Sequence, residues 1–428
     1  MTLSDLGPYP NAPGHDAAVA LDEADPLRHH RERYVHTDPD LIYLDGNSLG
    51  RLPVDAIKAI ESTTHRQWGD RLIRSWNDGW WDLQLRLGDK LAPLVGARPG
   101  EVVISDSTSV NLYKLAFAAV SAASPSRDKI VTDDLNFPSD VYILDSVARQ
   151  TRRTLEVVGS DGVHGPMPEL ARAIDGRTAL VSLSHTAFQS GYTYDLAEMT
   201  RLAHDAGALI LWDCSHSVGA VPIDFADSRV DLAVGCTYKH LNGGPGSPAF
   251  LYVRADLQDK LANPITGWWS HSEPFALDLE YRPVAGIRKF HTGTMPILSL
   301  AAIEAGIDDV LDASIESLRA KSAALASYLD DQYNQFLRPL GFDLASPTDP
   351  DRRGSHISLR HEKAWPINVA LIETAKVIPD FRAPDTIRLG LSPLYTRFVD
   401  VHTAVQRTVE VVTSGIYEQF SDVVSTVT

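Results

Sequence analysis

The stretch Ala208-Leu-Ile-Leu-Trp-Asp-Cys-Ser-His216 joins a run of apolar residues to an acidic residue and a histidine. Comparable short apolar runs lie at residues 101–105, 129–132, 178–183 and 231–236. Segments with a helical spacing of apolar residues, such as 196–206, separate these runs. Short buried strands that alternate with helices are typical of a mostly parallel sheet covered by helices on both faces. The sequence therefore predicts an α/β fold built around such a sheet.

The same alternation indicates where domains begin and end. We expect residues 55–305 to form the large domain that contains the sheet. A long amphipathic helix at about 298–334 would lead into a smaller α+β domain at 306–428, with strands near 355–360 and 386–391. Residues 1–54 would supply part of the small domain. Within them, residues 1–35 are rich in Pro, Gly, Asp and His and would form an arm rather than a packed unit.

Bulk properties exclude several classes of protein. The chain has 428 residues, 44% of them apolar, and a formal charge of −17 at pH 7, which disfavours binding to nucleic acid or anionic membranes. Its start is acidic and no apolar run approaches the ~18 residues that span a bilayer, so we expect neither a signal peptide nor a membrane segment. Only Cys214 and Cys236 are present, which indicates a cytoplasmic protein without a disulfide framework.

Ligands of open α/β sheets bind beyond the carboxyl ends of the strands, so polar residues that follow apolar runs are candidate site residues. Asp213 ends one such run and His216 follows it, although Asp213 could equally cap the next helix. Tyr238 and Lys239 follow another run, directly before the glycine-rich segment 242–246. Lysines are usually solvated, but burial would lower the pKa of Lys239 and allow its amine to form a Schiff base.

Three further candidates lie elsewhere in the chain. Ser107-Thr108-Ser109 begins a predicted helix and offers hydroxyl and N–H groups to a phosphate, although such residues also serve as simple N-caps. Asn136-Phe137-Pro138-Ser139-Asp140 presents a ring that could stack on a planar ligand or merely precede a helix. Arg388, in a predicted strand, would grip a carboxylate if it is buried and would be a solvated edge residue otherwise.

These features are weak singly and informative together. Pyridoxal 5'-phosphate (PLP) requires a phosphate site, a stacking face, an anion beside its pyridine nitrogen and an amine, and an amino-acid substrate requires a carboxylate clamp. The chain supplies all of them at the ends of predicted strands and helices. The pattern therefore predicts an enzyme that carries PLP on Lys239.

At these residues the sequence resembles the kynureninases, PLP-dependent hydrolases of fold type I, the aspartate aminotransferase superfamily. The resemblance runs from Tyr43-Leu-Asp-Gly-Asn-Ser-Leu-Gly50 to Ser392-Pro-Leu-Tyr395 and so covers nearly the whole chain except the arm. Its family-level marks are Phe137-Pro-Ser-Asp140, Tyr238-Lys239 and Gly267-Trp268. Asp-x-x-His with a later lysine is typical of the whole superfamily.

The resemblance implies a role for each candidate residue. Lys239 would bind the cofactor covalently, Tyr238 would bind its phosphate, and Asp213 would face the pyridine nitrogen. Tyr238 is also our candidate for a proton shuttle during bond cleavage, because its phenol can lie next to both the phosphate and the substrate. Arg388 would bind the α-carboxylate of the substrate. The remaining cofactor contacts would come from Thr108, Ser109, Phe137, Ser139, Asp140, Ser184 and His216, and, from a neighbouring subunit, Trp268 and Thr294. No metal is implied.

The implied reaction is hydrolysis of L-kynurenine to anthranilate and L-alanine by a cytoplasmic homodimer. This is a step of tryptophan catabolism and of NAD biosynthesis, and 3-hydroxy-L-kynurenine is a second candidate substrate. Animal members of the family have a histidine after the glycine in the region of Gly69, and that histidine is linked to the hydroxylated substrate. Asp70 stands there in this chain, which favours plain kynurenine.

Other activities stay open on the residues alone. A cysteine desulfurase or selenocysteine lyase shares the superfamily elements, but it needs a thiolate on a mobile loop, and both cysteines fall in or beside predicted buried strands. A transaminase would release a keto acid instead of anthranilate. A PLP-binding regulator without activity would need a basic DNA-binding segment, and the acidic composition argues against one.

Overall fold

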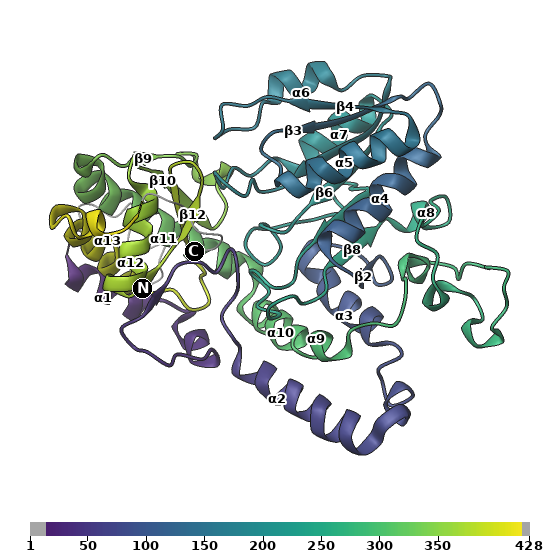
Figure 1. The fold of residues 1–428 in the computed structure, drawn as a ribbon, viewed down its shortest axis with the longest axis horizontal. Coiled ribbons are helices and arrows are strands. Elements are labelled where there is room, and N and C mark those ends of the chain that lie inside the picture. The colour runs from purple at the N-terminus through teal and green to yellow at the C-terminus, as the bar shows by residue number, and fades with distance from the viewer. Residues whose placement is uncertain (1–13, 422–428) are drawn as a thin grey trace.

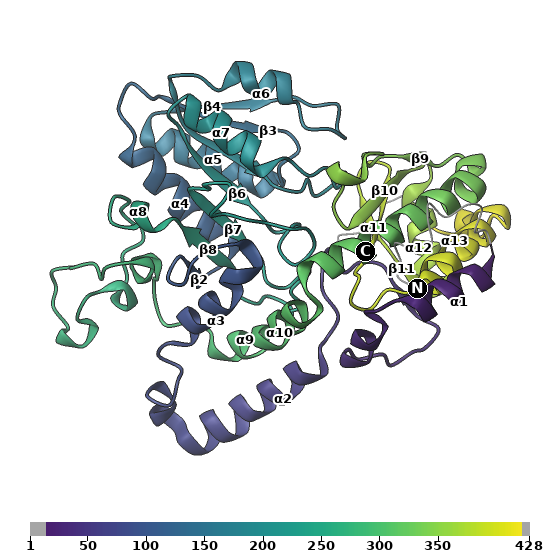
Figure 2. The same ribbon diagram turned by 180° about the vertical axis from the view of Figure 1, so that it is seen from behind.

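The computed structural model describes residues 14–421, and Figures 1 and 2 show two units, each built on its own sheet. The large sheet consists of β2 (Val102–Ile104), β8 (Phe250–Val253), β7 (Leu232–Gly235), β6 (Leu209–Asp213), β5 (Thr178–Ser184), β3 (Lys129–Asp133) and β4 (Thr154–Val158), in that spatial order. Only β8 pairs antiparallel with its two neighbours, and the remaining pairs are parallel. The predicted mostly parallel sheet is confirmed.

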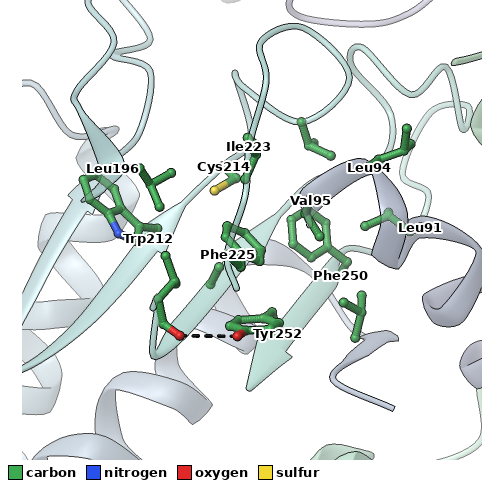
Figure 3. Packing of buried hydrophobic residues seen from close by; sticks show 14 of the residues in the cluster. Leu91, Leu94, Val95, Leu196, Trp212, Cys214, Ile223, Phe225, Phe250 and Tyr252 are labelled. Atoms are coloured by element: carbon green, nitrogen blue, oxygen red, sulfur yellow. Dashed lines mark hydrogen bonds between the residues drawn. The ribbon is translucent and has the colours of Figure 1, made fainter. Parts of the chain in front are cut away.

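Helices cover both faces of this sheet, which explains why its strands read as continuous apolar runs. The covering helices are α3 (Leu83–Leu91), α4 (Thr108–Ala122), α5 (Pro138–Thr151), α6 (Met167–Ala173) and α7 (Leu196–Asp205). The short helix α8 (Ala255–Gln258) follows β8. Alternate residues of one strand enter two different buried clusters: Trp212 packs on one face of the sheet and Leu211 on the other. Figure 3 shows the first cluster, where Trp212, Phe225 and Phe250 pack beside Cys214.

The smaller unit has an antiparallel sheet with helices packed against it. Its strands follow the order β12 (Asp380–Arg382), β13 (Thr386–Gly390), β10 (His356–Arg360) and β9 (Asp343–Leu344). The helices are α11 (Ile315–Gln332), α12 (Ala364–Ala375) and α13 (Phe398–Thr413). A separate pair of strands, β1 (Ile42–Tyr43) and β11 (Val377–Ile378), ties the N-terminal region to this unit.

Short 3₁₀ and π turns complete the described chain. They are η2 (Arg28–Arg33), η3 (Thr63–Arg71), η4 (Leu72–Trp76), η5 (Ala92–Val95), η6 (Trp268–Ser270), η7 (Pro274–Ala276), η8 (Ile287–Phe290), η9 (Tyr333–Leu337), η10 (Arg338–Leu340), η11 (Pro350–Arg352) and η12 (Ile416–Gln419). Helix α2 (Val54–Ser62) continues into η3 and projects from the body of the molecule (Figure 1). Between residues 14 and 421, no helix has both the length and the apolar character that crossing a bilayer requires.

Two expectations about local structure are wrong. The single helix expected at 298–334 is three helices, α9 (Ile297–Ala301), α10 (Ile303–Ala313) and α11. Ser314 separates the last two, because its backbone is left-handed (φ 61°) and its hydroxyl accepts a hydrogen bond from the Ser317 N–H at 3.2 Å as an N-cap.

The expected arm is packed wherever the structure describes it. Helix α1 (His15–Ala24) lies against α13, and the Asp22 carboxylate accepts hydrogen bonds from the first N–H groups of that helix, those of Phe398 and Val399. Asp25 forms a buried ion pair with Lys321 at 2.6 Å. Residues 1–13 of the expected arm lie outside the described residues.

Candidate active site

The carboxyl ends of β5, β6 and β7 lie side by side and bring the central candidates together. Ser184 pairs with Asp213, and Asp213 pairs with Val234, five residues before Lys239. The amine Nζ of Lys239 lies 2.7 Å from Nε2 of His216, which follows β6. The residues predicted from strand-end positions therefore meet at one edge of the sheet.

The surroundings of Lys239 favour an uncharged, nucleophilic amine. Burial, above all, lowers its pKa. Its hydrogen-bond partner is an imidazole, and burial, above all, lowers the pKa of His216 well below its ordinary value, so that ring is neutral. Of the buried lysines, Lys114 and Lys321 are instead paired with carboxylates at 2.7 and 2.6 Å, and Lys289 lies over the ring of Phe290. Lys239, which is half-buried and faces a neutral imidazole, is therefore the amine at this sheet edge that is best placed to attack a carbonyl.

The glycine-rich segment 242–246 folds the chain back beneath Lys239. Gly244 and Gly246 have left-handed backbones, with φ of 90° and 69°. Gly50 approaches the same loop from the N-terminal motif: its N–H donates to the Tyr238 carbonyl at 2.8 Å, and a Cβ there would lie 2.4 Å from the Lys239 carbonyl oxygen. The glycines thus serve close turns and close packing that hold the lysine in place.

Asp213 is a buried carboxylate held from two sides. Its Oδ1 accepts a hydrogen bond from the Ser215 N–H at 2.8 Å, and its carboxyl group contacts that of Asp140. Burial and then the charge of Asp213 raise the pKa of Asp140 well above its ordinary value. A protonated Asp140 donates a hydrogen bond to Asp213 and adds no second negative charge.

A cavity of about 420 Å³ opens beside this edge, at the N-terminus of α4. Ser107 is the N-cap, and its side chain accepts a hydrogen bond from the Val110 N–H. The cavity is lined by Ser107, Thr108, Ser109, Tyr238 and the segment Thr292–Pro296, among others. Hydroxyl groups and free N–H groups at a helix N-terminus suit a phosphate. Ser139, a further predicted contact, lies 3.2 Å from Ser109 through their hydroxyl oxygens.

Phe137 lies at the entry to α5, one turn before the Asp140 side chain that contacts Asp213. Its ring is 45% exposed and meets the ring of Phe188 edge-on, with centroids 5.2 Å apart. An exposed aromatic face so close to the buried carboxyl pair is available for stacking on a planar ligand.

Arg388 is buried rather than solvated, which removes the alternative of a strand-edge residue. Its Nε donates to the Asp380 carboxylate at 2.6 Å, one terminal nitrogen donates to the Ser48 hydroxyl at 3.1 Å, and the other donates to the Phe188 carbonyl. Its charge contributes to lowering the pKa of both His216 and Lys239, so it lies close to them. The carboxylate of a bound ligand could replace the partner that Arg388 binds most weakly.

Trp268 and Thr294 differ in where one chain places them. Thr294 lines the chain's own cavity beside Thr108 and Tyr238, so a single chain already brings it to the hydroxyl-lined site. Trp268 is 42% exposed and packs against Trp81, Trp269 and Phe275 away from that cavity. Delivery of either residue from a neighbouring subunit stays a prediction.

Sequence reasoning did not assign Ser48, His240, His356 or Asp380 to the site. Ser48 had a signal, because it belongs to the opening motif that ends at Gly50. Asp380 and His356 do not belong to any motif that their spacing in the sequence would reveal. They lie near Arg388 only because β12 and β10 pair with β13 on either side of it. Only the antiparallel register of the small sheet identifies them.

The chemistry of these side chains fits PLP. The 420 Å³ cavity with hydroxyl groups at a helix N-terminus suits the phosphate, the buried Asp213 suits the pyridine nitrogen, and the Lys239 amine suits the aldehyde. The buried Nδ1 of His216 has no protein partner and is free to contact a ring substituent.

Comparisons with known proteins agree with this chemistry. The family model described as the kynureninase C-terminal domain matches residues 318–408. The kynureninase of Pseudomonas fluorescens is 43% identical over 394 residues, which cover 91% of this chain and 93% of that protein. The kynureninase of Burkholderia pseudomallei (strain 1106a) is 41% identical over 395 residues, covering 91% and 94%.

Solved structures show the same fold at low sequence identity. The cysteine desulfurase of Thermococcus onnurineus NA1 has a TM-score of 0.77 at 18% identity and covers 92% of this chain and 98% of its own. A variant of C-DES with glycine linked to its PLP cofactor has a TM-score of 0.75 at 19% identity, covering 86% and 97%. The predicted PLP fold type I is confirmed.

Proposed function

Because the chain belongs to the kynureninase family, we propose that it is a PLP-dependent hydrolase that cleaves L-kynurenine to anthranilate and L-alanine. The observation that carries the proposal is the Lys239 amine, 2.7 Å from the neutral His216, at the sheet edge that also presents Asp213 and lies close to Arg388. These residues would bind the cofactor and the substrate carboxylate at one place.

PLP, when bound, supplies an aldehyde that links to amines and a ring that withdraws electrons from the substrate α-carbon. Lys239 would hold the cofactor and, once released, its neutral amine would take the proton from the α-carbon. Asp213, supported by Asp140, would keep a proton on the pyridine nitrogen. Arg388 would orient the substrate through its α-carboxylate.

Other residues would fix the cofactor without taking part in proton transfer. Thr108, Ser109, Ser139 and Thr294 would bind the phosphate, and Phe137 would cover the ring. Ser184, which pairs with Asp213 on the neighbouring strand, would line the ring edge. The positions of these residues support their proposed roles. All but Ser139 either line the 420 Å³ cavity or flank the Asp140–Asp213 pair.

Tyr238 is the proposed proton donor for cleavage of the Cβ–Cγ bond. It borders the cavity one residue from Lys239, and burial raises its pKa, so its phenol holds its proton at neutral pH. Tyr238→Phe should lower kcat at least about 100-fold, the usual effect of removing a positioned proton-transfer group, and leave the absorbance of the bound cofactor unchanged. Rapid-mixing measurements of anthranilate release test this, and a variant with full activity would exclude the role.

The buried cysteines disfavour a desulfurase. Burial raises the pKa of both Cys214 and Cys236, and Figure 3 shows Cys214 inside the apolar cluster rather than on an exposed loop. A thiol that stays protonated within a core cannot accept sulfur from a substrate.

Turnover assays on the purified, PLP-loaded protein test the proposed activity directly. We expect fluorescent anthranilate and an equal amount of alanine from L-kynurenine, and no sulfide from L-cysteine. A keto acid product without anthranilate would identify a transaminase instead. Parallel rates on 3-hydroxy-L-kynurenine measure the substrate preference that Asp70 predicts.

We further propose that the enzyme is a homodimer, located in the cytoplasm and serving tryptophan breakdown and NAD biosynthesis. The loop between α8 and α9 projects from the body (Figure 1) and exposes Phe275 (72%) and Leu277 (80%), while Ile73 in η4, directly after η3, is 75% exposed. Apolar surface on projecting segments suits a second copy of the chain. Such a copy would also bring Trp268 to a site.

Sedimentation should therefore show twice the mass of one chain. Leu277→Asp should shift the protein toward monomer and reduce activity, because a charge at that position opposes burial. A fully active monomer would contradict the shared site.

A further inference from the structure

His356 belongs to the small unit but lies against His216, the imidazole that contacts Lys239 in the large unit. It begins β10, is 1% exposed, and its ring meets that of His216 edge-on, with centroids 5.6 Å apart. The charges of Arg388 and Lys239 both act on it. His356 is thus close to the proposed cofactor amine and to the proposed carboxylate clamp.

The register of the small sheet places His356 beside Arg388 on one face. Ser358 pairs with Arg388 and His356 pairs with Gly390, so His356 and Arg388 are diagonal neighbours on the same side of the sheet. Such neighbours are separated by about 7–8 Å. A substrate held by its α-carboxylate at Arg388 would therefore bring polar atoms further along its side chain toward His356.

Several imidazole nitrogens of this region lack protein partners. Neither ring nitrogen of His356 has a partner in hydrogen-bond geometry, although the main chain of Gln189 lies near the ring. Nδ1 of His216 and Nε2 of His240 are also unpartnered, and all three rings are buried. Buried polar atoms normally find partners, so these nitrogens are available to a polar ligand.

The three rings are neutral, which defines what they can bind. Burial lowers the pKa of His356 and His216 well below the ordinary value and that of His240 to about 3. Over residues 14–421, no group of histidine, cysteine or carboxylate side chains is arranged to hold a metal ion. A neutral imidazole donates one hydrogen bond and accepts one, so it suits a carbonyl or hydroxyl oxygen rather than a second carboxylate.

We propose that His356 is a substrate-specificity residue whose neutral imidazole hydrogen-bonds to the oxygen on the γ-carbon of the substrate side chain. The proposal rests on the proposed function, which supplies an amino acid with a carbonyl at that carbon. Arg388 binds the α-carboxylate and His356 binds the γ-oxygen, and both side chains come from one face of the small sheet.

The test measures L-kynurenine and L-homophenylalanine with the PLP-loaded wild-type enzyme, two variants of His356 and one control variant. His356→Phe keeps a ring and removes both nitrogens, whereas His356→Gln keeps a donor and an acceptor. The KM for L-kynurenine should rise at least about tenfold in the phenylalanine variant and recover most of this loss in the glutamine variant. The affinity for L-homophenylalanine, which has the carboxylate and the aromatic ring but no γ-oxygen, should stay within about twofold, as followed by cofactor absorbance.

His361→Phe is the matched control. His361 follows β10, but both its nitrogens are bonded within the small unit, to the Leu340 carbonyl at 3.2 Å and the Lys363 N–H at 2.9 Å. That variant should lower the unfolding temperature and leave the ratio of the two affinities unchanged. Equal weakening of both ligands in His356→Phe, or an unchanged KM in a folded His356→Gln and His356→Phe pair, would overturn the proposal. Failure of the wild-type enzyme to cleave kynurenine would instead refute the proposed function.

Discussion

Replacing Lys239 by alanine should abolish measurable hydrolysis of L-kynurenine and the covalent attachment of PLP. The amine is the proposed point of cofactor attachment and the proposed base at the substrate α-carbon, and loss of a positioned base alone costs about 10²–10⁴-fold. The absorbance of the bound cofactor should shift to that of a free aldehyde, since the residue that links to it is gone. Stopped assays with high enzyme concentration and absorbance spectra measure the two effects separately.

A second lysine provides the control for this result. Lys114 is fully buried, but its amine is bound to the carboxylate of Asp106, which lines the 420 Å³ cavity, at 2.7 Å and to the Phe290 carbonyl at 2.8 Å. Borohydride reduction of the wild-type holoenzyme, followed by peptide mapping, should place the label on Lys239 and none on Lys114. A label on another lysine, or a catalytically active Lys239→Ala enzyme, would end the assignment.

The parts of the site that the sequence could predict are those that strand ends determine. Asp213 and Lys239 each follow an apolar run, and parallel strands bring their carboxyl ends to a common edge, so local order along the chain was enough to group them. Ser107 could be read in the same way, because an N-cap is a local feature. These residues depend on short-range sequence alone.

The parts that could not be predicted depend on pairing between distant segments. The contact of Arg388 with Asp380 arises from the register of β12 on β13, and that of His356 with His216 from the packing of the small unit on the large one. The break at Ser314 needs a left-handed backbone that apolar periodicity does not report. Tertiary packing determines each of these three features, and no single residue type in the sequence indicates such packing.

The burial of Arg388 gives a sharp prediction about substrate binding. Arg388→Ala should raise the KM for L-kynurenine at least about tenfold, because the α-carboxylate loses a charged hydrogen-bond partner, while the cofactor spectrum stays that of the wild type. It should also destabilise the protein, since removing one partner of a buried ion pair costs about 3–5 kcal/mol. Arg382, 3.0 Å from the other oxygen of Asp380, should reduce that cost. Steady-state kinetics and denaturant unfolding measure the two effects.

A double variant separates the binding role from the structural one. Asp380→Asn in the Arg388→Ala background removes the buried negative charge that has lost its Arg388 partner, so the unfolding free energy should recover in part while the KM stays high. The methyl ester of kynurenine, which has no α-carboxylate charge, should bind the wild type and both variants about equally. If the double variant regained the wild-type KM together with its stability, Arg388 would serve the fold and another cation would have to bind the substrate.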